Sequence, residues 1–211
     1  MYKETKIPDA TIERISIYSR PLEKLWEGGT LVVSSEQLAK LCKVNPAQVR
    51  KDLSHFGEFG VRGIGYGVQD LLMEIKRILV SDREWKLGIV GLGGMGMALI
   101  SHENFSKRGY RFVAAFDQDP ERAGEDLPSG LIIQPMNKLK SLTQSLGIEV
   151  GVIATQPTQA QAVADMFIDV GIKAILNFSP IKLRQPERCL MENVDFTVSL
   201  DNLAYHLNKV D

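Results

Sequence analysis

Residues 88–96 read GIVGLGGMG, and this stretch decides the fold of the longer part of the chain. An apolar run, KLGIV, leads into the glycines, and a helical pattern follows them. Glycines spaced as Gly91, Gly93 and Gly96 permit a tight turn, close approach of the backbone to a pyrophosphate, and close helix–strand packing. Free N–H groups at the helix N-terminus then face the anion. We therefore expect a nucleotide here, held by Gly91, Leu92, Gly93, Gly94, Met95 and Gly96.

An acidic residue ends the next apolar run, RFVAAFD at 111–117. Asp117 follows the glycines by about 20 residues, where a dinucleotide-binding domain places the carboxylate that binds the adenosine ribose. A carboxylate there would repel a 2′-phosphate, so NAD(H) is favoured over NADP(H). Gln118 lies beside it, and Asp119 is the alternative acceptor. A Rossmann-like domain that binds CoA, or no nucleotide, is the competing interpretation.

Short apolar runs continue to alternate with helical segments as far as residue 178. The runs GLIIQ, EVGVIAT and KAILNF have the character of buried parallel strands, and helical patterns cover about 95–107, 137–146 and 157–170. This alternation predicts an α/β Rossmann fold with a doubly wound parallel sheet of five strands. Thr155 and Pro157 follow the fourth strand and should lie at the carboxyl edge, where ligands bind.

The first 80 residues have a helical period instead. Ser34 with Gln37 three residues later forms a capping-box pattern, which predicts a short helix from Ser35 to residue 41 or 42. After a tight turn, Asn45 can cap a second helix that has Pro46 at its first position. Two short helices joined in this way are typical of a helix-turn-helix.

The second of these helices has one apolar face and one polar, basic face. Val49, Leu53 and Phe56 recur at helical spacing and should face a core. The outward side chains, together with a lysine in the turn, are then the DNA-binding candidates: Lys43, Gln48, Arg50, Lys51, Ser54 and His55. The whole chain carries a net charge of −1, so this basic face is local. A helical hairpin with a solvated charged face is the alternative.

Residues 58–67 predict a β-hairpin, which after a recognition helix would form the wing of a winged helix. Gly60, Gly63 and Gly65 would permit positive φ in this hairpin. Arg62 near the tip could enter a narrow A·T-rich minor groove. The predicted organisation is a winged-helix domain over 1–80, a linker at 81–85, a Rossmann domain over 86–198 and a C-terminal segment over 199–211.

The composition is that of a globular protein, with 44% hydrophobic and 24% charged residues. No apolar run reaches membrane-spanning length, and the polar N-terminus lacks a secretory pattern, so we expect a cytoplasmic protein without membrane contact. Cys42 and Cys189 are far apart, and the three histidines are scattered, which argues against a metal site.

An enzyme would need a substrate pocket and an acid or base beside the nicotinamide. About 35 residues follow the fifth strand, too few for a substrate domain by the usual domain sizes. His102 is the best candidate acid or base and is more typical of a pocket or surface histidine. We therefore expect no catalytic residues and a nucleotide that is sensed rather than consumed. The alternatives are a small NAD-dependent oxidoreductase with a helical dimerisation domain, and a DNA-binding regulator that senses another nucleotide.

Five segments together resemble the Rex family of redox-sensing transcriptional repressors, and they span nearly the whole chain in order. They are IPDATIERISIYSRPLE, VSSEQLAKLCKVNPAQVRKDLSHFGEFGVRGIGYGV, VAAFDQDPERAG, GIKAILNFSP and MENVDF. The resemblance implies a homodimer of winged-helix and NAD(H)-binding domains, with the C-terminal helix swapped into the partner. It also implies a repressor that NADH releases from double-stranded operator DNA, an A·T-rich inverted repeat.

The resemblance also implies roles for single residues. Arg50 and Lys51 match the recognition-helix pair, and Arg62 matches the wing contact. Arg20 and Asp195 match a charged pair that links the two domains in a switch with His102. Asn177 and Phe178 would lie at the strand-five edge of the nucleotide pocket, and Phe196 would lie near the nicotinamide of the partner subunit. Three positions depart from the family pattern: Val61 replaces a common lysine, His102 a frequent tyrosine, and Gly94 a residue with a side chain.

Overall fold

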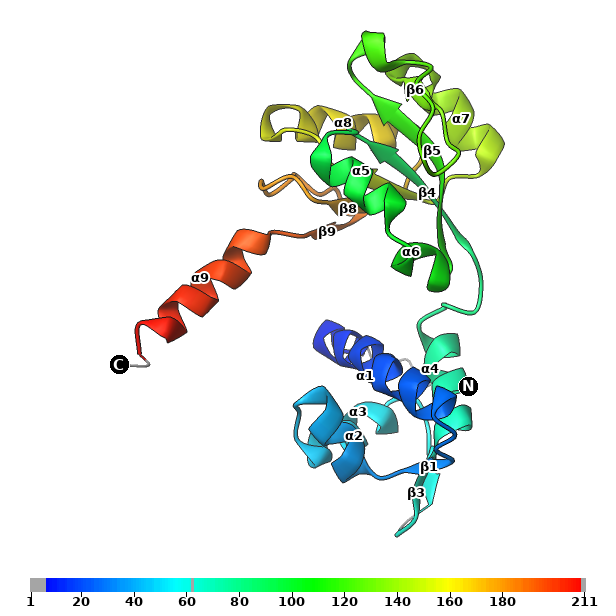
Figure 1. Cartoon of the computed structure of the whole chain (residues 1–211), viewed down its shortest axis with the longest axis vertical. Coiled ribbons are helices and arrows are strands. Elements are labelled where there is room, and N and C mark those ends of the chain that lie inside the picture. Colours follow the sequence, from blue (N-terminus) through cyan, green and yellow to red (C-terminus); the bar gives the residue numbers. More distant parts are fainter. Residues whose placement is uncertain (1–6, 62, 210–211) are drawn as a thin grey trace. The chain divides into compact units, whose positions relative to one another are not determined.

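The computed structural model describes residues 7–61 and 63–209, and the chain forms two compact units, Met1–Arg83 and Glu84–Asp211 (Figure 1). The described part of the first unit combines four helices with a small antiparallel sheet. Its helices and strands are α1 (Asp9–Glu27), β1 (Val32–Val33), α2 (Ser35–Cys42), α3 (Pro46–Ser54), β2 (Gly60–Val61), β3 (Gly65–Gly67) and α4 (Val68–Ile78). One apolar cluster, with Ile15, Tyr18, Leu38, Val49 and Leu71 almost completely buried, holds them together.

The helix-turn-helix of the first unit begins and ends where the capping residues predict. Ser34 Oγ accepts a hydrogen bond from the Gln37 N–H at 3.1 Å, and Gln37 Oε1 accepts from the Ser34 N–H at 2.8 Å. Asn45 Oδ1 accepts from the N–H of Ala47 at 2.8 Å at the start of α3. Lys43 adopts a left-handed φ of 55° and so turns the chain sharply between the two helices. The predicted capping box and N-cap are both confirmed.

The wing is a hairpin of β2 and β3, and β1 extends it to a three-stranded sheet in the order β1-β3-β2. Gly63 and Gly65 have positive φ values of 82° and 115°, as predicted. The prediction was wrong for Gly60, whose φ is not positive. A Cβ at Gly60 would lie 2.8 Å from the Tyr66 ring, so close packing explains this glycine. Arg62 lies outside the described residues.

The second unit is built on a parallel sheet in the order β6-β5-β4-β7-β8-β9. The first five strands correspond to the apolar runs of the sequence, and each pairs in parallel with its neighbours. They are β4 (Trp85–Val90), β5 (Tyr110–Asp117), β6 (Ile133–Pro135), β7 (Val150–Ile153) and β8 (Ala174–Asn177). This order is that of a Rossmann sheet, with its switch point between β4 and β7.

A sixth strand, β9 (Leu190–Asn193), corrects the prediction of five. It pairs in parallel with β8, with Ala174 opposite Leu190. Three of its four side chains are exposed, because it forms the edge of the sheet. An edge strand of this kind needs no continuous apolar run, so periodicity could not reveal it.

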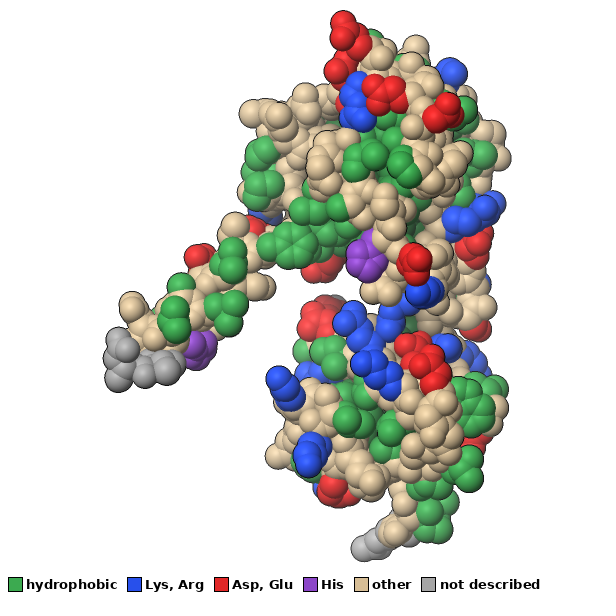
Figure 2. Space-filling view, viewed as in Figure 1, with side chains coloured by type: hydrophobic (Ala, Val, Ile, Leu, Met, Phe, Trp, Pro, Cys, Tyr) green, Lys and Arg blue, Asp and Glu red, His purple; other side chains and the backbone are tan. Residues whose placement is uncertain are grey.

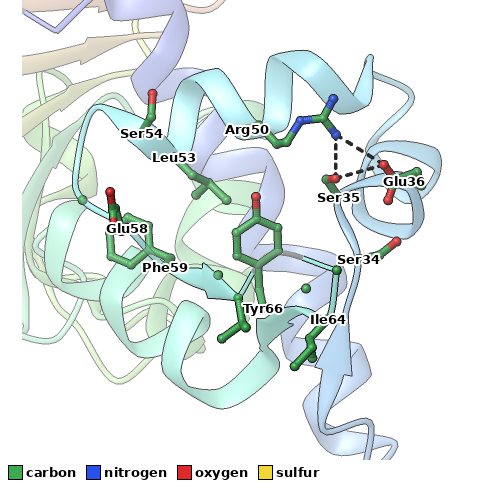
Figure 3. Close-up of a pocket in the computed structure, with 15 residues that line it drawn as sticks. Ser34, Ser35, Glu36, Arg50, Leu53, Ser54, Glu58, Phe59, Ile64 and Tyr66 are labelled. Atoms are coloured by element: carbon green, nitrogen blue, oxygen red, sulfur yellow. Dashed lines mark hydrogen bonds and ion pairs between the residues drawn. The ribbon is translucent and has the colours of Figure 1, made fainter.

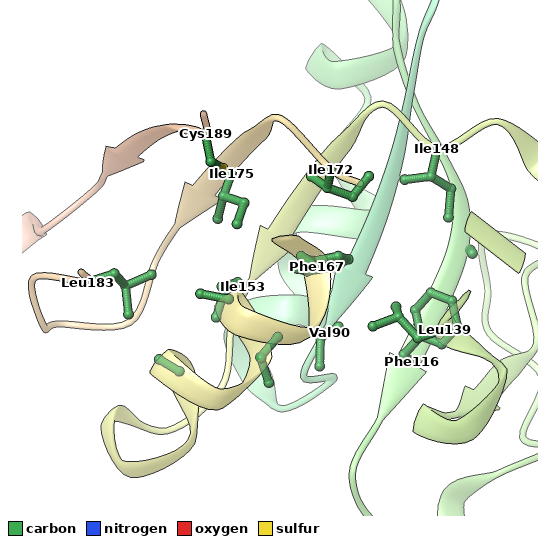
Figure 4. Packing of buried hydrophobic residues seen from close by; sticks show 14 residues of the cluster. Val90, Phe116, Leu139, Ile148, Ile153, Phe167, Ile172, Ile175, Leu183 and Cys189 are labelled. Atoms are coloured by element: carbon green, nitrogen blue, oxygen red, sulfur yellow. The ribbon is translucent and has the colours of Figure 1, made fainter. Parts of the chain in front are cut away.

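Helices cover both faces of this sheet, which confirms the doubly wound architecture. The covering helices are α5 (Gly94–Ser101), α6 (Asn104–Lys107), α7 (Leu139–Leu146) and α8 (Pro157–Asp169). Figure 4 shows the cluster on one face, where Phe167 of α8 lies among the strand side chains Val90, Ile153 and Ile175. A second cluster on the other face includes Leu99 of α5 and Phe105 of α6. The two clusters fix the carboxyl edge of the sheet, where the glycine-rich loop lies.

The last helix, α9 (Phe196–Leu207), has no buried residue. It begins a few residues before the C-terminal segment predicted at 199–211, because Asp195 caps it: Oδ1 accepts from the N–H of Thr197 at 2.9 Å. Leu200, Leu203 and Leu207 are each more than 60% exposed. Apolar side chains line the exposed surface of this helix in Figure 2. Such a helix requires another surface to cover it.

Candidate nucleotide-binding and nucleic-acid-binding sites

The glycine-rich loop between β4 and α5 has the geometry that the sequence predicts. Gly91 has a φ of 95°, and a Cβ there would lie 2.7 Å from the carbonyl oxygen of Ala154. A Cβ at Gly96 would lie 1.9 Å from the carbonyl oxygen of Gly91, so the helix packs on the loop without room for a side chain. A Cβ at Gly93 or Gly94 would meet no described atom within 4 Å. The loop is therefore open where an anion would approach the N-terminus of α5.

Asp117, the last residue of β5, is hydrogen-bonded to this loop. Its Oδ2 accepts from the N–H of Leu92 at 2.9 Å and from Nη1 of Arg122 at 3.2 Å. Its Oδ1 accepts from the N–H of Asp119 at 3.0 Å. Gln118 follows, half-buried. The Asp117 carboxylate is thus oriented beside the glycines, where it can accept a hydrogen bond from a ribose hydroxyl.

Thr155 lies after β7, at the same edge of the sheet. Its Oγ1 is buried and has no hydrogen-bond partner among the described residues. Its methyl group would lie 2.8 Å from a Cβ at Gly91, so Thr155 adjoins the glycine-rich loop. Pro157 is the first residue of α8, and Met95 lies in the first turn of α5 with its side chain exposed. A buried, unsatisfied hydroxyl beside an open glycine-rich loop fits a polar ligand such as a dinucleotide.

Asn177 and Phe178 at the end of β8 differ in what they offer a ligand. Asn177 is completely buried, and Nδ2 donates to the carbonyls of Ser179 and Ile181 and to Oδ1 of Asn193. It therefore orders the strand end rather than presenting a free amide. Phe178 stacks on Phe196 with ring centroids 6.3 Å apart, and Phe196 is 54% exposed. These rings form an apolar surface beside the strand end.

The polar face of α3 is exposed as predicted at Arg50, Lys51, Ser54 and His55, and Lys43 in the preceding turn is also exposed. Gln48 differs: it is half-buried, and its Nε2 donates to Asp52 Oδ1 at 2.8 Å. A hollow of about 580 Å³ lies between α3, the start of α2 and the wing. In Figure 3 Arg50 points across this hollow toward α2. Arg50 Nη1 donates to Ser35 Oγ at 2.8 Å and lies 3.3 Å from Glu36 Oε1.

A buried carboxylate joins α3 to α1, and the sequence interpretation missed it. Asp52 is 0% exposed and accepts from Arg14 Nε at 2.6 Å, Arg14 Nη2 at 2.8 Å and the Tyr18 hydroxyl at 2.7 Å. Burial acts to raise the pKa of Asp52, but the hydrogen bonds from Arg14, Tyr18 and Gln48 outweigh it and lower the pKa below its usual value. The signal in the sequence that could have revealed this cluster is an acidic residue, Asp52, at a position that faces the core side of α3.

The three predicted switch residues lie in two different units. Arg20 lies exposed on α1 in the first unit. In the second, Asp195 caps α9, and its hydrogen bonds with Thr197 lower the pKa of its carboxyl group. His102 follows α5 as its C-cap. Its Nδ1 accepts from the N–H of Asn104 at 3.2 Å, and its ring meets Phe105 edge-on. Their coupling remains a prediction.

Within residues 7–61 and 63–209, no group of three or more His, Cys, Asp or Glu side chains could hold a metal ion. None of the helices described there is long and apolar enough to cross a membrane. Cys189 is buried and Cys42 half-buried, and both are free thiols. Burial raises the pKa of each thiol, which makes both poor nucleophiles at neutral pH.

The fold and these sites define a two-domain protein with a winged helix-turn-helix and a Rossmann-type nucleotide-binding domain. The family model described as "Putative DNA-binding protein N-terminus" matches residues 6–54, and the one described as "CoA binding domain" matches residues 82–181. The chain belongs to the Rex family of redox-sensing transcriptional repressors. It is 52% identical over 206 residues to the redox-sensing transcriptional repressor Rex of Syntrophobacter fumaroxidans, covering 98% of both chains.

Other relatives agree with this assignment. The Rex repressor of Solidesulfovibrio magneticus is 46% identical, with 97% of this chain and 93% of that protein covered. The crystal structure of RSP in complex with β-NAD⁺ and operator DNA is similar, with a TM-score of 0.91 and 32% identity over 98% of this chain and 94% of the other. RSP in complex with β-NADH gives a TM-score of 0.88 at 30% identity, covering 98% and 96%.

Proposed function

We propose that this protein is a cytoplasmic transcriptional repressor that binds operator DNA and leaves it when NADH binds. The observation that carries the proposal is the presence, in one chain, of an exposed basic recognition helix and an open GxGxxG loop with a hydrogen-bonded Asp117. The similarity to a repressor crystallised with both β-NAD⁺ and operator DNA supports it. DNA binding and nucleotide sensing are thereby assigned to separate units.

On the DNA side, we propose that α3 enters the major groove. Arg50 and Lys51 would contact bases and backbone, with Ser54 and His55 beside them. Their exposure on one helix supports this role. Lys43 would reach a phosphate from the turn, and Arg62 is proposed as the DNA contact of the wing. Gln48 would contact DNA only if its amide left Asp52, so its contribution should be small.

On the nucleotide side, we propose NADH and NAD⁺ as the ligands. The glycine-rich loop would hold the pyrophosphate, Asp117 the adenosine ribose, and Thr155 a polar group of the dinucleotide through its unsatisfied Oγ1. Phe178 would adjoin the nicotinamide, and Phe196, which stacks on Phe178, would lie near the nicotinamide of the partner subunit. CoA is the competing ligand, since the family model matched by this unit is described by CoA binding. A 3′-phosphorylated adenosine would meet the Asp117 carboxylate unfavourably.

The exposed apolar side of α9 supports a homodimer in which this helix is inserted into the partner subunit. NADH would then draw the two nucleotide domains together, and the spacing of the two recognition helices would no longer match the half-sites. Arg20, Asp195 and His102 would couple the nucleotide to this change. The ligand shifts such an equilibrium only by its differential affinity for the two states.

A gel-shift assay on an A·T-rich inverted repeat, titrated separately with NADH, NAD⁺, NADPH and CoA, tests the proposal. We expect release with NADH and little release with NADPH or CoA. Arg50→Ala should abolish the shift but leave NADH binding intact, because the two sites lie in different units. Loss of both activities in Arg50→Ala would contradict separate sites.

The relatives described above are named redox-sensing transcriptional repressors, which supports a sensing role for the nucleotide. We propose accordingly that the protein has no catalytic residues. A small NAD-dependent oxidoreductase would instead consume NADH steadily with a panel of carbonyl substrates and would give no shift on the palindrome. Absorbance at the NADH band, followed with excess substrate, distinguishes the two functions.

A further inference from the structure

Arg122 brings a positive charge to the predicted ribose site and has no part in the function proposed above. It ends a short 3-10 turn, Pro120–Arg122, that follows β5. Its Nη1 donates to the carbonyl oxygen of Leu92 at 2.8 Å and to Asp117 Oδ2 at 3.2 Å. On the other side, Nε and Nη2 donate to Glu125 Oε2 at 3.2 and 3.1 Å. The guanidinium thus joins the glycine-rich loop, the end of β5 and the following loop.

The surroundings of Arg122 keep it charged and fix its direction. Its side chain is 28% exposed, and that of Asp117 is 15% exposed. The hydrogen bond with Glu125 is the main cause that raises the pKa of Arg122, and the charges of Asp117 and Asp119 add to it. Asp117 and Glu125 therefore occupy two edges of a planar donor that can bind a phosphate in bidentate fashion.

Asp117, by contrast, retains room for one more donor. An ionised carboxylate offers about four acceptor sites. The N–H groups of Leu92 and Asp119 and the guanidinium of Arg122 fill three of them, two on Oδ2 and one on Oδ1. The remaining site on Oδ1 suits a ribose hydroxyl and repels a 2′-phosphate. As long as the carboxylate is present, it both attracts NADH and neutralises the adjoining cation.

We infer that Arg122 is a latent 2′-phosphate ligand: Asp117 keeps it occupied, and it contributes to nucleotide specificity once the Asp117 carboxylate is removed. Removal of the Asp117 carboxylate eliminates the repulsion and frees the Nη1 edge of Arg122 at the same time. A dinucleotide with a 2′-phosphate then finds a cation already oriented by Leu92 and Glu125, an arrangement of the kind that accommodates NADP(H) in Rossmann domains. The inference rests on the proposed binding of NAD(H) at this loop.

The test is a double-mutant cycle on the full-length protein, with NADH and NADPH affinities measured by calorimetry. Asp117→Ala should weaken NADH binding about 10-fold and strengthen NADPH binding about 10-fold, so that the affinity ratio changes about 100-fold. Asp117→Ala combined with Arg122→Ala should lose most of this gain in NADPH affinity and keep only the part that comes from removing the Asp117 charge. Arg122→Ala alone should keep the preference for NADH.

Two further variants make the result independent of folding. Asp117→Asn keeps an acceptor for the Leu92 N–H but removes the charge, so it should shift the preference in the same direction by a smaller factor. Arg184→Ala, an exposed arginine with a carboxylate partner at 3.8 Å, controls for loss of positive charge and should change neither affinity. Unfolding curves of each variant identify any loss of structure.

The outcomes separate this inference from the proposed function. If wild type binds NADH but Asp117→Ala gains no affinity for NADPH, or gains it equally without Arg122, the role of Arg122 is wrong and the proposed function stands. If wild type binds neither NADH nor NADPH, both fail. A gain in NADPH affinity that falls sharply when Arg122→Ala is added supports both.

Discussion

Two aspartates of this protein are each paired with an arginine, yet they lie in different surroundings. Asp52 in α3 is completely buried, and five donor atoms from Arg14, Tyr18, Gln48 and Thr11 surround it. Asp117 at the end of β5 has three donors and keeps part of its side chain exposed. A carboxylate with every acceptor site filled holds the fold together, whereas one with a site to spare can bind a ligand.

Removal of the buried carboxylate, Asp52, should have the largest effect. Asp52→Ala leaves the guanidinium of Arg14 and the hydroxyl of Tyr18 without their acceptor, and it should lower the unfolding free energy of the first unit by about 3–5 kcal/mol. Urea unfolding followed by Trp26 fluorescence in a Trp85→Phe background reports on this unit.

Two control variants set the scale for the loss of stability in Asp52→Ala. Asp82→Ala removes an exposed carboxylate and should change stability by less than about 0.5 kcal/mol. Asp117→Ala loses hydrogen bonds at a partly exposed site, so its cost to the second unit should be about 1 kcal/mol. A loss of similar size in Asp52→Ala and Asp117→Ala would remove the distinction between the two carboxylates.

The second prediction concerns the glycines to which Asp117 is hydrogen-bonded. In Gly96→Ala the new methyl group would lie 1.9 Å from the Gly91 carbonyl oxygen, so helix and loop must separate. NADH affinity should fall about 100-fold, or about 2.7 kcal/mol. Gly94→Ala is the matched control, because its methyl group meets no described atom within 4 Å and should reduce affinity less than about threefold. Equal losses in calorimetry would contradict the packing role of Gly96.

The local features of both units could be read from the sequence because their causes are local. The capping box of α2, the Asn45 cap of α3 and the glycines of the nucleotide loop each depend on residues a few positions apart. Asp117 was also predictable, since the length of one βαβ unit fixes its distance from the glycines. Contacts of these residues with DNA and nucleotide remain predictions.

The Asp52 cluster shows what sequence patterns could not supply. Arg14 precedes Asp52 by 38 positions, so their ion pair depends on how α1 packs against α3. The same packing explains Gln48, which pattern alone assigned to the outward face and which donates to Asp52 instead. The edge strand β9 was missed for a related reason, since pairing with β8 defines it and its own residues are mostly exposed.

A third prediction uses acid to neutralise Asp52 without changing its shape. The pKa of its carboxyl group is lower in the folded unit than its unfolded value near 3.9, so its stabilising effect is present above that value and is lost as pH falls through the folded pKa. The difference in unfolding free energy between wild type and Asp52→Asn should therefore shrink below about pH 4.

Urea unfolding curves at neutral pH and at several lower pH values measure this difference. The change should be smaller than the loss in Asp52→Ala, because a protonated carboxyl group still accepts hydrogen bonds. A difference that stays constant or grows on acidification would contradict a lowered pKa at Asp52.

The smallest expected effect is at Glu36, an exposed carboxylate paired with Arg50 of the proposed recognition helix. Arg50 and Glu36 are 53% and 66% exposed, so solvent screens the pair and it adds little to stability. Near DNA, Glu36 repels phosphates and competes for the guanidinium. Glu36→Gln should therefore strengthen binding to non-operator DNA about threefold. The ratio of operator affinity to non-operator affinity should fall, because Arg50 loses an orienting partner.

Gel shifts on an inverted repeat and on a scrambled duplex measure both affinities for Glu36→Gln. Glu27→Gln is the control, since it removes the same charge from an exposed position at the end of α1, outside the residues that line the hollow. If Glu27→Gln strengthened non-operator binding as much as Glu36→Gln, net charge would explain the effect. An effect specific to Glu36→Gln would mean that Glu36 binds Arg50, which the operator needs, and is exposed enough to release it. Its role would then be intermediate between those of Asp52 and Asp117.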